Sequence, residues 1–350
     1  MSSSNPWGVS RTVTQIPRES KKNKPKNSII SLITLVILIA GTGCTQTNTT
    51  GSVNTEQSPQ AQEAASTPAQ KSGKIKVVAT FLPIYWFTKA VAGDTADVTI
   101  LVPPGTEVHE YQATPENVKA IATANVLVKN GLGLEEFLEA TVKNAQNPKL
   151  TQIDAGKSIQ PIEKISPVVE TGNHEEHDHE HDGGNPHIWL DPVLAKQQVI
   201  NIRDGLIAAD PANKNTYEIN AAAYIKQLDS LNNQYQQTLQ QNPNCTFITF
   251  HDAYPYLAKR YNLKQVAVVE IPEDQLTPTD VQKAVNAVKK YKVKALFGEP
   301  GIDNKLLTSL SKDLNLTLRE LDSLETGPTD PQHYFQAMQN NLQTLETACK

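Results

Sequence analysis

The sequence predicts an α/β protein of two lobes, each with a mostly parallel sheet flanked by helices, joined by one long rigid helix. Short β-branched runs alternate with helical stretches in two separate parts of the chain, 75–154 and 246–348, and this alternation is typical of successive βαβ units. A polar-rich helical block, 192–239, lies between the two sets. The 350 residues are long enough for more than one domain with its own hydrophobic core.

The first set of alternating strands and helices begins shortly after residue 72, where a segment without hydrophobic periodicity ends. Thr114 and Pro115 mark the start of one of its helices, because threonine is favoured at the N-cap and proline at the first helical position. The predicted strands are 75–79, 98–102, 126–128 and 150–154, and the predicted helices are 82–91, 115–124 and 134–144.

The second set repeats this plan after Cys245 and runs almost to the end of the chain. The predicted strands are 246–250, 265–269, 294–297 and 317–321, and the predicted helices are 253–261, 279–291, 304–314 and 331–348.

The connecting block is interrupted at Asp210-Pro211, since proline breaks a helix interior but is tolerated in the first turn. The segment 211–239 after this break has apolar residues at steps of three and four, which is helical spacing. At about 1.5 Å per residue, this helix is roughly 43 Å long, enough to run the height of both lobes as a stiff connector. Its periodic residues are Tyr217, Ala221, Tyr224, Ile225, Leu228, Leu231, Tyr235 and Leu239.

The N-terminal part of the chain has the pattern of an export signal. Basic residues are followed by the apolar run 29–40 and then by Gly41-Thr42-Gly43-Cys44. The twelve residues of this run are too few to span a bilayer, which takes about 20, although a retained short anchor is an alternative. Cys44 stands where a bacterial lipoprotein is acylated, while Gly41 departs from the usual leucine and leaves soluble export open. The segment 44–72 has the composition of a flexible tether.

Charge and cysteine content narrow the class of protein further. The net charge of −5 argues against a nucleic-acid partner, which usually meets a basic surface. Beyond Cys44 the chain holds two cysteines, Cys245 and Cys349, which can pair in an oxidising compartment or remain as two buried thiols.

Three single histidines stand in loop-like contexts. His109 follows a Pro-Pro-Gly turn, His187 follows Asn-Pro, and His251 comes directly after a predicted strand, as does Asp322. Ligands of α/β sheets bind at the carboxyl ends of the strands. Three imidazoles and one carboxylate suit Zn²⁺ in tetrahedral geometry, although a single histidine beside a strand is more often a hydrogen-bonded loop or core residue than a metal ligand.

The remaining histidines include a dense cluster in the segment 173–184, where imidazoles alternate with carboxylates and no apolar residue is present. This composition predicts an auxiliary loop that collects divalent metal, with a merely solvated acidic loop as the alternative. His333 has the context of an ordinary surface residue. The histidines of the cluster are His174, His177, His179 and His181.

From residue 74 onward the chain contains a set of short motifs, which are Pro104-Gly105, His109-Glu110-Tyr111, Asn185-Pro186-His187-Ile188-Trp189-Leu190-Asp191-Pro192, His251-Asp252-Ala253-Tyr254 with Tyr261, and Glu299-Pro300. In these motifs the chain resembles the solute-binding receptors of bacterial ABC importers for zinc and manganese, most closely the zinc-type receptors.

The resemblance implies a non-enzymatic, high-affinity Zn²⁺ receptor that delivers the metal to the permease and ATPase subunits of an ABC importer. It implies that the metal lies in the cleft between the lobes, with His109, His187, His251 and Asp322 as ligands, and that Cys245 is bridged to Cys349. The receptor is expected to be a monomer in the periplasm or on the outer face of the cytoplasmic membrane, where lipid on Cys44 would anchor it. The implied organisation is an export signal 1–43, a tether 44–72, an N-terminal lobe 73–190, a helical connector 191–243 with its long helix 211–239, and a C-terminal lobe 244–350.

Other functions are compatible with parts of this sequence. A manganese or iron receptor of the same family is one alternative, but a histidine at the third position and a His-rich insertion resemble the zinc-type members. An adhesin-type surface lipoprotein is a second. A zinc hydrolase is disfavoured, because His174-Glu175-Glu176-His177 is one residue shorter than H-E-x-x-H and four protein ligands leave no position for water.

Overall fold

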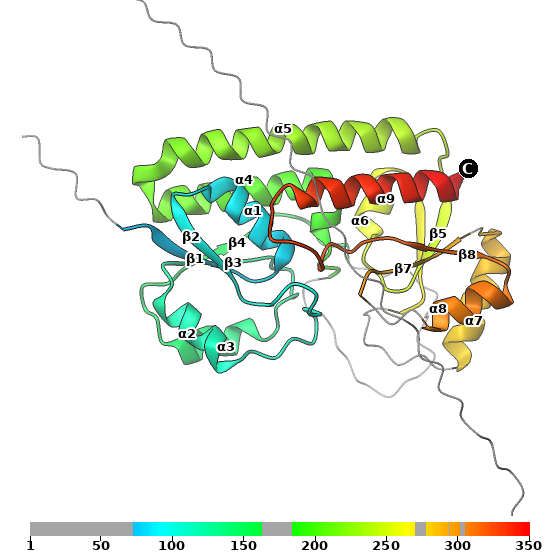
Figure 1. Cartoon of the computed structure of the whole chain (residues 1–350), viewed down its shortest axis with the longest axis horizontal. Coiled ribbons are helices and arrows are strands. Elements are labelled where there is room, and N and C mark those ends of the chain that lie inside the picture. Colours follow the sequence, from blue (N-terminus) through cyan, green and yellow to red (C-terminus); the bar gives the residue numbers. More distant parts are fainter. Residues whose placement is uncertain (1–72, 163–183, 270–277, 294, 302–304) are drawn as a thin grey trace, which may run out of the picture. The chain divides into compact units, whose positions relative to one another are not determined.

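The computed structural model describes residues 73–162, 184–269, 278–293, 295–301 and 305–350 (Figure 1). The predicted signal, the tether with Cys44, and the four histidines of the His-rich cluster lie outside these residues. The described part holds two four-stranded parallel sheets, one per lobe, and the predicted fold class is confirmed. None of its helices combines the length and the hydropathy of a membrane span.

The first sheet has the strand order β2-β1-β3-β4. The hydrophobic strands β1 and β3 lie at its centre, where Val77 pairs with Val98 on one side and with Val126 on the other. Its elements are β1 (Ile75–Ala79), α1 (Leu82–Ala92), β2 (Ala96–Ile100), α2 (Pro115–Thr123), β3 (Val126–Lys129), α3 (Leu138–Ala145) and β4 (Thr151–Asp154).

The second sheet repeats the same order as β6-β5-β7-β8. Its central strand β5 leads directly into His251, so the topology places that histidine at the carboxyl edge of the sheet. Its elements are β5 (Thr246–Thr249), α6 (Pro255–Arg260), β6 (Lys264–Ala267), α7 (Pro278–Tyr291), β7 (Ala295–Gly298), α8 (Lys305–Asp313), β8 (Thr317–Glu320) and α9 (His333–Cys349).

Two elements of the first lobe differ from their predicted bounds by more than one residue. The strand predicted at 98–102 lies at 96–100, because Leu101 and Val102 are buried just beyond the strand and imitate its hydrophobic pattern. The helix predicted from residue 134 begins at Leu138. Gly131 and Gly133 both have positive φ and form a turn that delays the helix.

The connector consists of α4 (Pro192–Ala209), a 3₁₀ turn (Pro211–Asn213) and α5 (Lys214–Leu239), so the first three residues of the predicted long helix form the turn instead. Every periodic residue predicted for this helix is buried except Ile225, which is half-buried. Helix α5 packs on α1 of the first lobe and on α9 of the second, and Figure 1 shows it running along both. Its Tyr224 hydroxyl donates to the Pro331 carbonyl at 3.0 Å.

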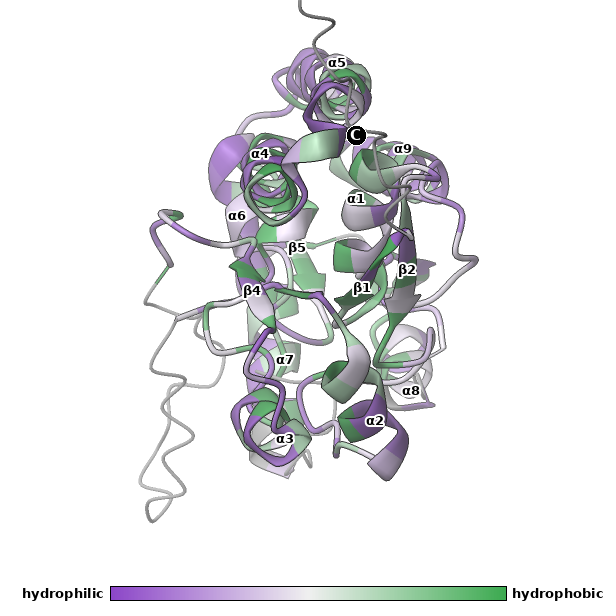
Figure 2. Ribbon diagram, turned by 90° about the vertical axis from the view of Figure 1, so that its left-hand side faces the viewer, coloured by the Kyte–Doolittle hydropathy of each residue, from purple (hydrophilic) through white to green (hydrophobic). Residues whose placement is uncertain are grey.

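One hydrophobic core extends across both lobes. Figure 2 shows the hydrophobic strands β1 and β5 below the helices α4, α5 and α9. Indole N–H groups cross between the lobes, with Trp86 donating to the Pro328 carbonyl at 2.9 Å and Trp189 donating to the Ser323 carbonyl at 2.8 Å. Arg260 Nε also pairs with the buried Asp191 carboxylate at 2.7 Å, which joins α6 to the start of α4. Residues of the two lobes are therefore held in a fixed relation to one another.

A disulfide joins the start of the first strand of the second lobe to its last helix. Cys245, at the start of β5, is bonded to Cys349, the last residue of α9, so the pairing implied by the resemblance is present. The bridge fastens the C-terminal helix to the amino end of the strand whose other end carries His251.

Candidate metal centre

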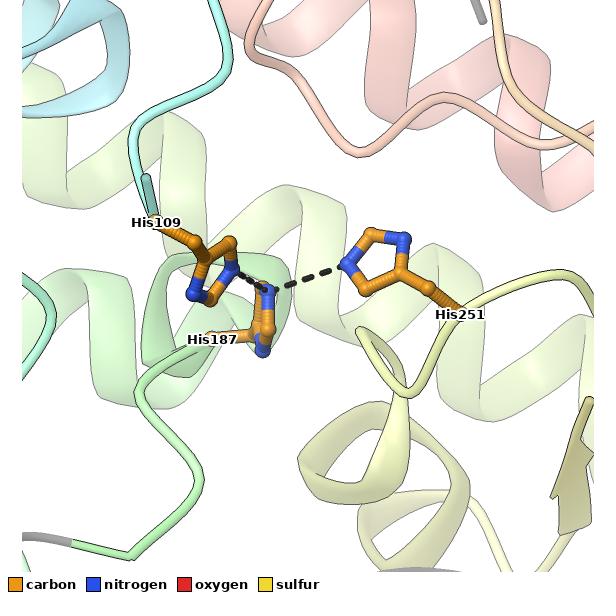
Figure 3. Close-up of side chains that lie close together, drawn as sticks. All are labelled: His109, His187 and His251. Carbon is orange, nitrogen blue, oxygen red and sulfur yellow. Dashed lines mark hydrogen bonds between the residues drawn. The ribbon is translucent and has the colours of Figure 1, made fainter. Parts of the chain in front are cut away.

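The three single histidines meet between the lobes (Figure 3). His187 Nε2 lies 3.1 Å from His109 Nε2 and 3.1 Å from His251 Nε2. All three ligand atoms lie within 4.8 Å of one another, and the side chains are buried, with exposed fractions of 8%, 1% and 0% for His109, His187 and His251. Three imidazole nitrogens thus converge on one point.

The loop between β2 and α2 positions His109. The Gly105 N–H donates to the Glu325 carbonyl at 2.9 Å, which ties this loop to the second lobe. The Glu107 carboxylate accepts from the N–H groups of Val108 at 2.9 Å and His109 at 3.3 Å. These contacts fix the backbone that presents the imidazole.

His187 lies at the start of a 3₁₀ turn (Ile188–Leu190) that leads into α4. Asn185 Oδ1 accepts from the His187 N–H at 3.1 Å and lies 3.0 Å from the ring atom Nδ1. Asn130 donates from Nδ2 to the Pro186 carbonyl at 3.1 Å, and Gln198 donates to Asn130 Oδ1 at 2.9 Å. A network of buried amides therefore supports this segment.

Glu299, a buried residue directly after β7 in the same lobe, holds the ring of His251 in place. Its carboxylate contacts Nδ1 of the imidazole. Burial lowers the pKa of the His251 imidazole. The negative charge of Glu299, its hydrogen bond to the ring and the charge of Glu107 all raise this pKa. Together they outweigh the effect of burial, so the pKa is raised overall. A carboxylate on Nδ1 also fixes the ring and makes Nε2 a more basic ligand.

The donor set fits a zinc ion. Imidazole nitrogens are ordinary ligands of Zn²⁺, and three of them with one oxygen complete a tetrahedral site. Oxygen-rich sites are the ones that suit manganese. Acceptors on Nδ1 of His187 and His251 leave Nε2 of each ring as the nitrogen that is available to a metal.

The carboxylates around the three histidines differ from the predicted arrangement. Asp322 follows β8 as expected, but its Oδ1 accepts from the Leu324 N–H at 2.7 Å. Among the described residues, the group of ligand atoms within 4.8 Å contains only the three imidazoles. Glu107 Oε1 lies 4.0 Å from His109 Nε2, and burial raises the pKa of the Glu107 carboxyl.

No role was predicted for Glu107, and Asn185 and Glu299 were named only within the motifs that carry the resemblance. The rule that found His251, a polar residue after a parallel strand, applies equally to Glu299 after β7. His333, expected at the surface, is half-buried beside the ring of Trp86, with 5.6 Å between ring centroids.

Residues 77–348 match the family model of the zinc-uptake complex component A, periplasmic. The chain belongs to this family.

Relatives in the family are named for zinc. The zinc-binding lipoprotein AdcA of Streptococcus pneumoniae is 35% identical over 296 residues, which are 81% of this chain and 57% of AdcA. The high-affinity zinc uptake system protein ZnuA of Bacillus subtilis is 32% identical over 288 residues, which are 79% of this chain and 88% of ZnuA. The chain thus spans little more than half the length of AdcA.

Solved structures of the family share the fold. The Zn(II)-bound ZnuA-like domain of Streptococcus pneumoniae AdcA is 34% identical with a TM-score of 0.65, covering 79% of this chain and 99% of that domain. The laminin-binding protein Lmb of Streptococcus agalactiae, described as a bifunctional protein with adhesin and metal transporting activity, is 29% identical with a TM-score of 0.68. The match covers 79% of this chain and 100% of Lmb. The predicted resemblance to zinc-type receptors is confirmed.

Proposed function

We propose that this protein binds Zn²⁺ outside the cytoplasm and delivers it to the permease and ATPase subunits of an ABC importer. The observation that carries the proposal is the convergence of Nε2 of His109, His187 and His251 in a buried site between two lobes. The names of the relatives and the Zn(II)-bound AdcA domain support zinc as the cargo.

Zinc binding at this site is expected to depend on pH. Each imidazole must be neutral to bind a metal, so protons compete with zinc and affinity falls as pH falls through the histidine range. Because Glu299 raises the pKa of His251, this competition begins at a higher pH than for an ordinary histidine. An acidic environment at the membrane partner would therefore favour release.

The proposed site is a carrier site without catalysis. A catalytic zinc keeps an open coordination position for water, whereas three imidazoles and a protein oxygen fill the tetrahedron. We further propose residues 1–43 as the export signal, acylated Cys44 with the tether 44–72 as the membrane link, and a monomer as the working form.

Zinc is expected to bind more tightly than manganese at one site per chain, because three imidazoles favour Zn²⁺. Calorimetric titration of metal-free protein with each ion, and then of the manganese-loaded protein with zinc, measures the difference. Manganese binding as tight as zinc binding at neutral pH would overturn the assignment.

Adhesion is a second candidate, favoured by the likeness to Lmb. Binding to immobilised laminin, measured with the wild-type chain and with a His187→Ala variant, tests it separately from metal uptake. Laminin binding that is independent of His187 would assign adhesion to another surface.

An oxygen donor is expected to complete the zinc site, and we propose Asp322 for this role. Because water can replace one oxygen ligand, Asp322→Ala should weaken zinc binding only about tenfold, far less than loss of an imidazole. Glu107→Gln is the matched comparison, since Glu107 lies near His109 Nε2. Chelator competition with both variants decides between the two acids, and a larger loss for Glu107→Gln would move the role to Glu107.

Deleting residues 173–182 is expected to leave the tightest zinc site intact and to remove only weaker sites. None of the three convergent histidines lies in this segment. Its composition offers no apolar residue to hold it on the fold, so binding there must order the chain at an entropic cost. Zinc titration of the intact and shortened chains measures stoichiometry. An unchanged number of bound ions, or loss of the tightest site, would contradict the auxiliary role.

A further inference from the structure

The side chain of Asn185 lies at the junction of the two lobes and is buried. On one side, its Oδ1 contacts the N–H of His187 at 3.1 Å and ring atom Nδ1 of His187 at 3.0 Å. On the other side, its Nδ2 contacts the carbonyl of Asp252 at 2.7 Å and the Asp252 carboxylate at 3.3 Å. Asp252 is the neighbour of His251 in the chain. One amide thus contacts one metal ligand and the residue beside another.

The two backbone contacts settle which way the amide points. A backbone N–H can only donate and a backbone carbonyl can only accept, so oxygen must face His187 and nitrogen must face Asp252. The reversed amide would set its NH₂ group against the backbone N–H of His187 and its oxygen against the carbonyl and the carboxylate of Asp252. This orientation therefore follows from partners whose roles cannot change.

The amide orientation then determines the tautomer of His187. Asn185 Oδ1 is an acceptor, so the Nδ1 atom 3.0 Å away must carry the proton of the neutral imidazole. Nε2 is then the unprotonated nitrogen, and it is the atom that lies 3.1 Å from Nε2 of both His109 and His251. We propose that Asn185 is a positioning residue that holds His187 in the zinc-binding tautomer and links this tautomer to the contact between the lobes. This inference rests on the proposed function.

An asparagine suits this position better than an acid. An aspartate would keep the acceptor for His187, but its second oxygen would face the carbonyl and the carboxylate of Asp252. The bond across the lobes would be replaced by repulsion between like charges. The acceptor at Nδ1 of His187 is thus the neutral amide of Asn185, whereas the acceptor at Nδ1 of His251 is the carboxylate of Glu299.

Imidazole tautomers can be read directly by long-range ¹H–¹⁵N NMR of the metal-free protein, at a pH above the titration range of histidine. In the wild-type chain His187 is expected to carry its proton on Nδ1. In Asn185→Ala the ring should populate the Nε2–H form, and zinc affinity, measured by chelator competition, should fall about 10–100-fold. Asn201→Ala is the control, because the Asn201 amide bonds main-chain carbonyls away from the site and its loss should change neither readout.

Asn185→Asp gives a second test that keeps the acceptor. We expect it to retain the Nδ1–H tautomer of His187 while its thermal midpoint falls, because the lobe contact is lost. An Asn185→Ala variant with the wild-type tautomer and an affinity within about twofold of wild type would overturn the inference, as would an Asn185→Asp variant that loses the tautomer. Failure of the wild-type chain to bind zinc would instead overturn the proposed function, and the tautomer measurement would still stand.

Discussion

A His187→Ala variant is expected to lose high-affinity zinc binding. Its imidazole is the central one of the three, with Nε2 3.1 Å from the corresponding atom of both His109 and His251. Apparent zinc-binding free energies of four-ligand protein sites are about 10–16 kcal/mol, so one ligand accounts for roughly 3 kcal/mol. The affinity should therefore fall at least about a hundredfold. His109→Ala and His251→Ala should have effects of the same order.

Competition with a chelator of known affinity measures this loss, and the thermal midpoint of each metal-free variant shows whether the fold is kept. His333→Ala is the control, because this histidine packs beside Trp86 and is not among the three convergent side chains. A variant of His109, His187 or His251 that binds zinc like the wild type would remove that histidine from the ligand set. Equal losses in all variants, His333→Ala included, would point to a general effect on folding.

The large-scale fold could be predicted because each lobe repeats a local pattern. Every strand of the two sheets was expected within about two residues, since β-branched runs and helix starts are encoded in short stretches of sequence. The errors arise where buried residues lie outside regular structure, as at Leu101 and Val102. The late start of α3 has a different cause, the turn at Gly131 and Gly133. Burial is set by the tertiary fold and cannot be read from one strand alone.

The candidate site could be predicted only in part. His251 was found because the carboxyl end of a parallel strand is a known position for ligands, and the same rule would have indicated Glu299. Asn185 could not be recognised as a positioning residue, because its role depends on Asp252, a residue 67 positions away in the chain. The role predicted for Asp322 depends on the resemblance, because Asp322 is not among the three convergent side chains.

Loss of the disulfide is expected to have the largest effect on stability. The bridge joins residues 104 positions apart, and closing a loop of about 100 residues is worth roughly 4.7 kcal/mol in the chain-entropy model, with native bridges usually worth about 2–5 kcal/mol. A Cys245→Ser, Cys349→Ser double variant should therefore unfold about 10 °C below the wild type, since 1 kcal/mol shifts the midpoint of a large domain by about 2–4 °C. Differential scanning calorimetry without reductant gives both midpoints.

The same double variant should keep most of its zinc affinity. The contribution of the disulfide to stability can then be distinguished from any contribution to zinc binding. Cys245 lies before β5 and His251 lies after it, so the strand of four residues stands between the disulfide and the metal ligands. Helix α9 is also held along its length by contacts that do not involve sulfur, including the bond from the Tyr334 hydroxyl to the Trp189 carbonyl at 2.9 Å. Wild-type protein treated with reductant is the control, because it opens the bridge without a substitution. An unchanged midpoint would contradict the stabilising role, whereas a loss of zinc affinity as large as that of His187→Ala would show that the fastening of α9 also holds the ligands in place.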